Sequence, residues 1–251
     1  MRRNHTRAAL GAAILSLGAA AGVVLPAAGC GSGGSGGTGG GGTGPVTTIL
    51  HPNAPPLPGQ SECKVVEVTG IPVASAMHVP ACTPVDYPTN PPSGGNHWAI
   101  WAAYKKYTAP IPREMYVHDL EHGAVVLLYR CDGACPDVVA ALDEVFASLS
   151  DPSCAGPPGP SARVIVAPDP DLDTPIAAAA WGATYTATCI DVTSLEAFAA
   201  DHYAQGPEDL CGDGLDVSVG SPCASTADAG PDAADADLPD TGVEDAGEGG
   251  G

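Results

Sequence analysis

Residues 124–149, AVVLLYRCDGACPDVVAALDEVFASL, contain the clearest secondary-structure signals in the chain. The first six residues, 124–129, form a continuous apolar run with β-branched members, which is typical of a strand buried on both faces. Pro136 stands where the first turn of a helix accepts proline. Apolar residues then recur at helical spacing, at Val138, Leu142, Val145 and Leu149. We therefore expect a buried strand at 124–129 and a helix at about 136–149.

Further elements lie on both sides of this unit. Residues 64–68 (KVVEV) alternate as a first strand does, residues 163–167 (RVIVA) predict a second buried strand, and residues 176–190 (IAAAAWGATYTATCI) predict a third. Thr193 and Glu196 have the spacing of a capping box at the start of a closing helix. The order predicts a single α+β (or α/β) domain, with a mixed sheet covered by at least two helices.

The first 29 residues have the composition of a signal peptide. Three arginines precede an apolar stretch at residues 8–25, and small residues then lead to Cys30. The sequence Ala-Gly-Cys suits a lipoprotein signal peptidase, so we expect an exported protein anchored through a lipidated Cys30; ordinary cleavage with a free thiol is the alternative. No aspartate follows Cys30, which makes the outer membrane the expected destination.

Low-complexity segments flank the expected domain. Residues 30–61 open with a glycine-rich run and continue into a proline-rich stretch, so we assign them to a flexible tether. Residues 224–251 carry eight acidic and no basic side chains, so we expect a disordered tail. The folded domain is then residues 62–223.

The charge balance excludes one class of partner. The chain has 29 acidic and nine basic residues, and residues 46–223 alone hold 21 acids against six bases. Binding to phosphates depends on lysine and arginine, so we expect no nucleic-acid partner. The one partner surface that the sequence does indicate is the membrane, reached through the lipid anchor.

Cysteine usage predicts an oxidised protein. Besides Cys30 there are eight cysteines, an even number that indicates disulfides in an exported chain: Cys63, Cys82, Cys131, Cys135, Cys154, Cys189, Cys211 and Cys223. Short separations favour pairing Cys63 with Cys82 and Cys211 with Cys223, and leave the other four open among themselves. A zinc site built from these thiols is the alternative, but the tight CxxC pairs typical of such sites are absent.

Cys131 and Cys135 lie between the strand at 124–129 and the helix that follows, where thioredoxin-like proteins keep a redox pair. Their spacing is one residue longer than in that motif. We therefore favour a structural bridge.

Histidines gather in segments punctuated by glycine and proline. His97 ends NPPSGGNH, and VHDLEHG contains His118 and His122. His118 and His122 are four residues apart, which places them about 6 Å apart on one side of a helical turn. Gly123 is suited to end that turn. We expect these three histidines, with His78, to bind a metal or a small polar ligand.

Two acidic residues of the same motif, Asp119 and Glu121, are candidates to orient a liganding ring from the second shell. The expected metal is divalent, zinc or copper; Met77 and Met115 lie near the histidines in sequence, and soft thioethers would favour copper. The alternative is that the rings only hydrogen-bond the backbone and fix the loops, which would make the protein a structural or interaction lipoprotein.

A further alternative is a metallohydrolase. Residues 118–122 satisfy the H-x-x-E-H pattern, in which two histidines bind zinc and the glutamate activates water. That motif belongs inside a long helix with another glutamate downstream, whereas Gly123 and the strand after it stop any helix, and Glu196 is already assigned to a cap. We therefore favour a binding domain over an enzyme.

Two motifs together carry a family resemblance. HVPACTPVDYPTNPPSGGNHW at 78–98 and VHDLEHGAVVLLY at 117–129 resemble an uncharacterised bacterial family, domain of unknown function 3105, whose motifs are PPTSGPH and VHNLEHG. The matching residues are Pro91, Pro92, Gly95, His97, Val117, His118, Leu120, Glu121, His122 and Gly123. The residues that depart are Ser93, Gly94, Asn96 and Asp119. The resemblance covers roughly residues 62–205 and implies an envelope protein of unknown activity.

Overall fold

The computed structural model describes residues 44–154, 160–212, 214–218 and 222–223. The expected signal peptide, the lipidated Cys30, most of the glycine-rich run and the acidic tail lie outside these ranges. Within the described ranges, no helix is long and apolar enough to cross a membrane.

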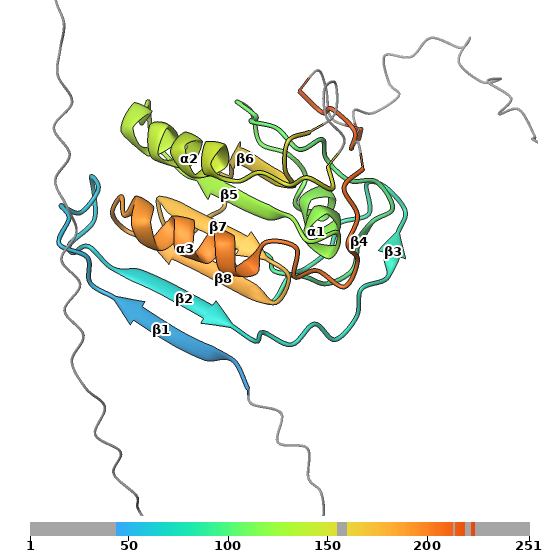
Figure 1. Ribbon diagram of the computed structural model, residues 1–251, viewed down its shortest axis with the longest axis horizontal. Helices are drawn as coiled ribbons and strands as arrows, with labels where there is room; N and C mark the ends of the chain where they lie inside the picture. The colour runs from blue at the N-terminus through green and yellow to red at the C-terminus, as the bar shows by residue number, and fades with distance from the viewer. Residues whose placement is uncertain (1–43, 155–159, 213, 219–221, 224–251) are drawn as a thin grey trace, which may run out of the picture. The chain divides into compact units, whose positions relative to one another are not determined.

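A six-stranded mixed sheet forms the centre of the fold, in the order β1-β2-β8-β7-β5-β6 (Figure 1). Strands β5 and β6 run parallel, and the other neighbouring pairs are antiparallel. The strands are β1 (Val46–Leu50), β2 (Val65–Thr69), β5 (Val125–Tyr129), β6 (Val164–Pro168), β7 (Ile176–Ala180) and β8 (Ala183–Ala187). The predicted α+β domain with a mixed sheet is confirmed.

Strand β5 separates two hydrophobic cores because its side chains alternate between the faces of the sheet. Val125 and Leu127 belong to one core, and Val126 and Leu128 belong to the other. All four are fully buried, as the continuous apolar run predicts. The helices are α1 (Arg113–Glu121), α2 (Pro136–Ser148) and α3 (Val192–His202).

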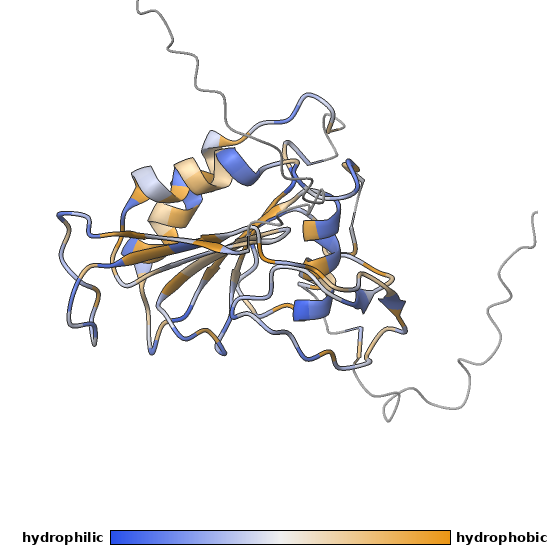
Figure 2. Cartoon of the chain, turned by 90° about the horizontal axis from the view of Figure 1, so that it is seen from below, coloured by the Kyte–Doolittle hydropathy of each residue, from blue (hydrophilic) through white to orange (hydrophobic). Residues whose placement is uncertain are grey.

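Helices α2 and α3 lie side by side over one face of the sheet, with α2 over β5 and β6 and α3 over β7 and β8 (Figure 1). Their buried positions are apolar, for example Leu142 on α2 and Phe198 on α3. Figure 2 shows apolar residues along the strands and on the helices beside them. The helix predicted at 136–149 is confirmed to within one residue.

Three details of the predicted elements are wrong. Strand β1 lies within the segment that the sequence assigns to the tether. All five of its residues are exposed, so its sequence carries no alternation of buried and exposed positions that would indicate a strand. Residues 176–190 form a hairpin of two strands, since Gly182 adopts φ +69° and turns the chain between β7 and β8. Helix α3 starts one residue before Thr193, and Asp191 is its N-cap without a side-chain capping bond, so there is no capping box.

All eight described cysteines form disulfides: Cys63–Cys189, Cys82–Cys223, Cys131–Cys135 and Cys154–Cys211. The favoured pairings of Cys63 with Cys82 and of Cys211 with Cys223 are therefore wrong. The register of β2 and β8 pairs Val65 with Ala187, and continuing it by two residues brings Cys63 to Cys189. Pairing follows the sheet rather than the distance along the chain.

Candidate metal centre

Helix α1 packs on the face of the sheet opposite to α2 and α3, and it runs directly into β5. It ends at His122, and Gly123 then adopts φ +84°, so that the Ala124 N–H reaches back to the Asp119 carbonyl at 2.9 Å. A Cβ at Gly123 would stand 2.9 Å from the Cα of Ala204. Glycine therefore fits this turn both in conformation and in space.

Two further histidines reach α1 from a separate two-stranded element. Strands β3 (His78–Val79) and β4 (His97–Trp98) run parallel and pair His78 with His97 directly. Strand β4 packs against α1, which brings both rings to the C-terminal half of the helix. The parallel register thus joins residues that lie 19 positions apart in the chain.

Four side chains converge at this junction: His78, His97, His118 and Glu121. Each offers one nitrogen or oxygen atom, and these atoms all lie within 4.8 Å of one another. Glu121 Oε2 is 3.0 Å from His97 Nε2 and 3.7 Å from His78 Nε2. Three imidazoles and one carboxylate form a donor set that a divalent transition metal accepts.

Backbone carbonyls fix the tautomers of two rings. His97 donates its Nδ1 hydrogen to the Gly95 carbonyl at 2.8 Å, and His118 donates its Nδ1 hydrogen to the Trp98 carbonyl at 2.7 Å. A carbonyl can only accept, so in the neutral form of each ring Nε2 carries the lone pair. Both lone pairs belong to the atoms on the cluster side, as a metal ligand requires.

Burial favours the neutral form of His118. His97 and His118 are buried, and burial together with repulsion from neighbouring imidazoles lowers the pKa of His118 to about 4. The Trp101 ring lies 5.1 Å from that of His118 and forms part of an apolar wall. The side chain of His78 is 51% exposed, so the cluster meets solvent at this ring.

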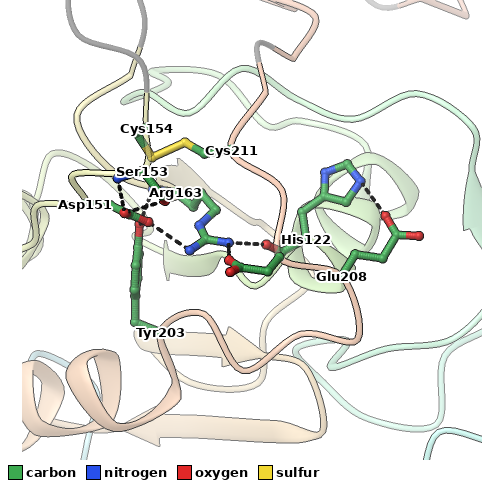
Figure 3. Close-up of polar contacts among 9 residues, drawn as sticks. His122, Asp151, Ser153, Cys154, Arg163, Tyr203, Glu208 and Cys211 are labelled. Atoms are coloured by element: carbon green, nitrogen blue, oxygen red, sulfur yellow. Dashed lines mark hydrogen bonds and ion pairs between the residues drawn. A yellow bond between two sulfur atoms is a disulfide. The ribbon is translucent and has the colours of Figure 1, made fainter.

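His122 lies beside the four-residue cluster rather than in it. Its Nε2 is 3.1 Å from His118 Nε2. The same atom is 3.3 Å from Glu208 Oε2 (Figure 3). Burial, with the neighbouring histidines, also lowers the pKa of His122 to about 4. The ring is therefore a neutral neighbour of one of the four donors.

A buried arginine holds the backbone around His122. The Arg163 guanidinium donates to the His122 carbonyl at 2.9 Å, to Asp151 at 2.8 Å and to Asp209 (Figure 3). Tyr203 donates to Asp151 as well. Burial opposes ionisation of Asp151, but hydrogen bonds from Ser153, and then from Tyr203 and Arg163, hold its pKa well below the usual range. The network ties the C-terminal end of α1 to the segment after α3.

That segment passes unusually close to the site. A Cβ at Gly206 would stand 2.3 Å from the Glu121 carbonyl oxygen, and the Glu208 N–H donates to the same carbonyl at 3.0 Å. Only glycine leaves room for this approach. Nothing in the local sequence signals it, because the contact joins residues more than 80 positions apart.

The two acidic residues expected in the second shell have different positions. The Glu121 carboxylate lies among the donor atoms themselves. Asp119 is fully buried and accepts from the Ala102 N–H at 3.1 Å, and among the described residues it bonds no imidazole. Burial raises its pKa well above the usual range and so favours the protonated, neutral carboxyl.

The fold and the site define a disulfide-bonded α+β domain with a His3Glu cluster, and its four disulfides indicate an extracytoplasmic protein. A family model matches residues 78–213, more than half of the chain, so the chain belongs to the family described as DUF3105, protein of unknown function. All four cluster residues lie within the match. No curated protein and no solved structure matches the chain.

Proposed function

We propose that this domain binds one divalent transition-metal ion through His78, His97, His118 and Glu121. The observation that carries the proposal is the convergence of four donor atoms, within 4.8 Å of one another, from two separate parts of the fold. Three of the four side chains are buried, and inside the protein His97 Nε2 faces Glu121 Oε2 at 3.0 Å instead of solvent. A bound cation would satisfy the lone pairs that the backbone carbonyls direct toward the cluster.

The two distances from the Glu121 carboxylate to histidine nitrogens are close to donor spacings in zinc sites. Metal–ligand distances in tetrahedral zinc sites place neighbouring donors roughly 3.3–3.6 Å apart. The two distances from Glu121 Oε2, 3.0 and 3.7 Å, bracket that value. Met115 is buried within the core, and Met77 is 68% exposed. Nitrogen and oxygen donors alone favour Zn²⁺ or Cu²⁺ over a thioether-bound copper.

The arrangement favours binding over hydrolysis. In an H-x-x-E-H hydrolase both histidines bind the metal, and the glutamate stays free to activate water. Here Glu121 lies within the donor set and His122 lies outside it. The proposed role is therefore capture of a metal ion at the cell envelope, with access past the exposed ring of His78.

Metal content tests this proposal. Untagged protein reconstituted with zinc or with copper, and then desalted, should hold one equivalent per chain by elemental analysis. The His118→Ala variant should lose it, whereas His51→Ala, which changes an exposed histidine outside the cluster, should retain it. Substoichiometric metal in the wild type with both ions would refute the proposal.

We further propose that Cys30 anchors the protein to the outer membrane and that no nucleic acid is a partner. Support comes from the signal-peptide pattern, the glycine-rich tether and the acidic composition. The intact mass of the mature N-terminus is the test: diacylglycerol on Cys30 is expected. Cys30→Ser should yield a soluble protein or an uncleaved precursor, and an unmodified Cys30 in the wild type would refute the anchor.

A further inference from the structure

The Cys131–Cys135 disulfide differs from the other three in the loop that it closes. It joins the end of β5 to the N-terminus of α2 across a separation of four residues, CDGAC. The other bridges span separations of 57, 126 and 141 residues. The constraint that a disulfide places on the unfolded chain grows with loop length, so this small ring contributes least to the fold.

The ring is also accessible. Asp132, Gly133 and Ala134 are exposed, and both of its cysteines are partly exposed. By contrast, Cys63, Cys189 and Cys154 are buried, while Cys82 of the Cys82–Cys223 bridge is exposed. A disulfide must meet an incoming thiolate in line with its sulfur–sulfur bond, so accessibility leaves Cys131–Cys135 and Cys82–Cys223 as the bridges that can react. The small ring and its place at a helix N-terminus distinguish Cys131–Cys135 from Cys82–Cys223.

A cavity of about 180 Å³ borders the ring directly. Besides the ring itself, its walls include apolar Leu57, Pro58, Val138 and Pro175 and polar Gln60 and Arg130. A hollow with both apolar and polar walls next to a sulfur–sulfur bond suits an extended peptide segment that carries a thiol.

We propose that Cys131–Cys135 is a thiol–disulfide exchange site that accepts electrons from a protein dithiol outside the cytoplasm. The first thiolate of that dithiol bonds to Cys131 Sγ and displaces Cys135 as a thiolate. The second thiolate then attacks the mixed disulfide at the partner's own sulfur and releases Cys131. The partner leaves as a disulfide, and its two electrons and two protons end on Cys131 and Cys135.

The helix makes Cys135 the better leaving group. Cys135 is the N-cap of α2, where unpaired backbone N–H groups and the helix dipole stabilise a negative charge. A stabilised leaving thiolate speeds the first step and favours the reduced form, so the disulfide acts as an oxidant. This assignment is independent of the metal cluster, which uses none of these residues.

A redox titration of the full chain tests the proposal without any variant. Native protein is equilibrated in glutathione buffers with a chelator present, alkylated, and mapped by mass spectrometry. Cys131–Cys135 should open first, at a [GSH]²/[GSSG] value at least about tenfold below that of any other bridge. Near-ultraviolet circular dichroism should stay unchanged through that step. Opening after another bridge, or only together with unfolding, would overturn the proposal.

Transfer to a substrate is the second arm. A reduced synthetic peptide with two cysteines should be oxidised stoichiometrically by the wild type and not by Cys131→Ala/Cys135→Ala. The matched control, Cys82→Ala/Cys223→Ala, removes a different bridge and should keep the wild-type transfer. Equal transfer by the wild type and the Cys131→Ala/Cys135→Ala variant, or none by the wild type, would contradict an exchange site.

Discussion

The two faces of the sheet bury different kinds of side chain. On the face of α2 and α3 the buried side chains that fill the core are apolar, whereas the face of α1 combines an apolar core with buried His97, His118 and Asp119. Burying polar groups destabilises a fold unless each finds a partner, so a chain keeps them where they serve another purpose. The first face therefore stabilises the domain, and the second holds the candidate site.

A substitution in the core under α3 should change the free energy of unfolding strongly and leave metal binding at the other face intact. Phe198→Ala removes a buried ring from the core under α3 and should lower the free energy of unfolding by about 3–5 kcal/mol. The folded protein should keep its metal stoichiometry, because Phe198 is outside the cluster. Urea unfolding and elemental analysis measure the two quantities. Thr193→Ala, on the exposed side of the same helix, is the control and should change neither.

Metal should stabilise the domain through the second face. A ligand that binds only the folded state at 100 times its dissociation constant adds about 2.7 kcal/mol of stability. Wild-type protein should show this gain on adding zinc to the metal-free form in thermal unfolding, and His118→Ala should not. A zinc response in His118→Ala equal to that of the wild type would place the binding site elsewhere.

The sequence predicts those parts of each face that depend on local patterns, and it does not predict those that depend on contacts between distant segments. Strand 124–129 and the helix after it are local patterns, and the structure reproduces both. Strand β1 was missed, because it is an edge strand whose side chains are exposed. The run 176–190 gives little sign of its turn, since Gly182 is the single turn-forming residue between two stretches that both suit a strand.

For the site, the spacing of His118 and His122 correctly predicted a helical turn that ends at Gly123. The same helix places Glu121 one turn from His118, a signal available in the sequence but outweighed by the pattern of paired histidines. The pairing of His78 with His97 and the approach of Glu208 depend on contacts between distant segments, which no local pattern encodes.

Acidification should lower the free energy of unfolding of the metal-free protein, because of two histidines on the α1 face of the sheet. His118 and His122 have pKa values lowered to about 4, against about 6.5 when unfolded, so below pH 6.5 the unfolded state binds more protons. Stability should therefore fall by about 1.4 kcal/mol per pH unit for each ring as the pH drops from 6.5 to 4. Urea unfolding with a chelator present measures this slope.

Asp119 opposes this slope, because its raised pKa lets the folded state keep a proton that the unfolded state releases above pH 4. The Asp119→Asn variant removes that contribution and should show the steeper loss of stability on acidification. A flat profile in Asp119→Asn would mean that the two rings are not held neutral by burial.

The smallest expected effect distinguishes two carboxylates that lie near histidine rings on the second face. Glu121 is buried and lies among the donors, whereas the side chain of Glu208 is 54% exposed and approaches only His122. Replacing an exposed group outside the coordination shell changes free energies by about 0.5 kcal/mol or less, so Glu208→Gln should alter zinc affinity no more than about twofold. Glu121→Gln removes a charged ligand of nearly the same shape and should weaken zinc by much more. Competition against a chromophoric chelator measures both. If the two variants lose affinity equally, the metal lies between His118, His122 and Glu208, and the coordination sphere must be redrawn around His122.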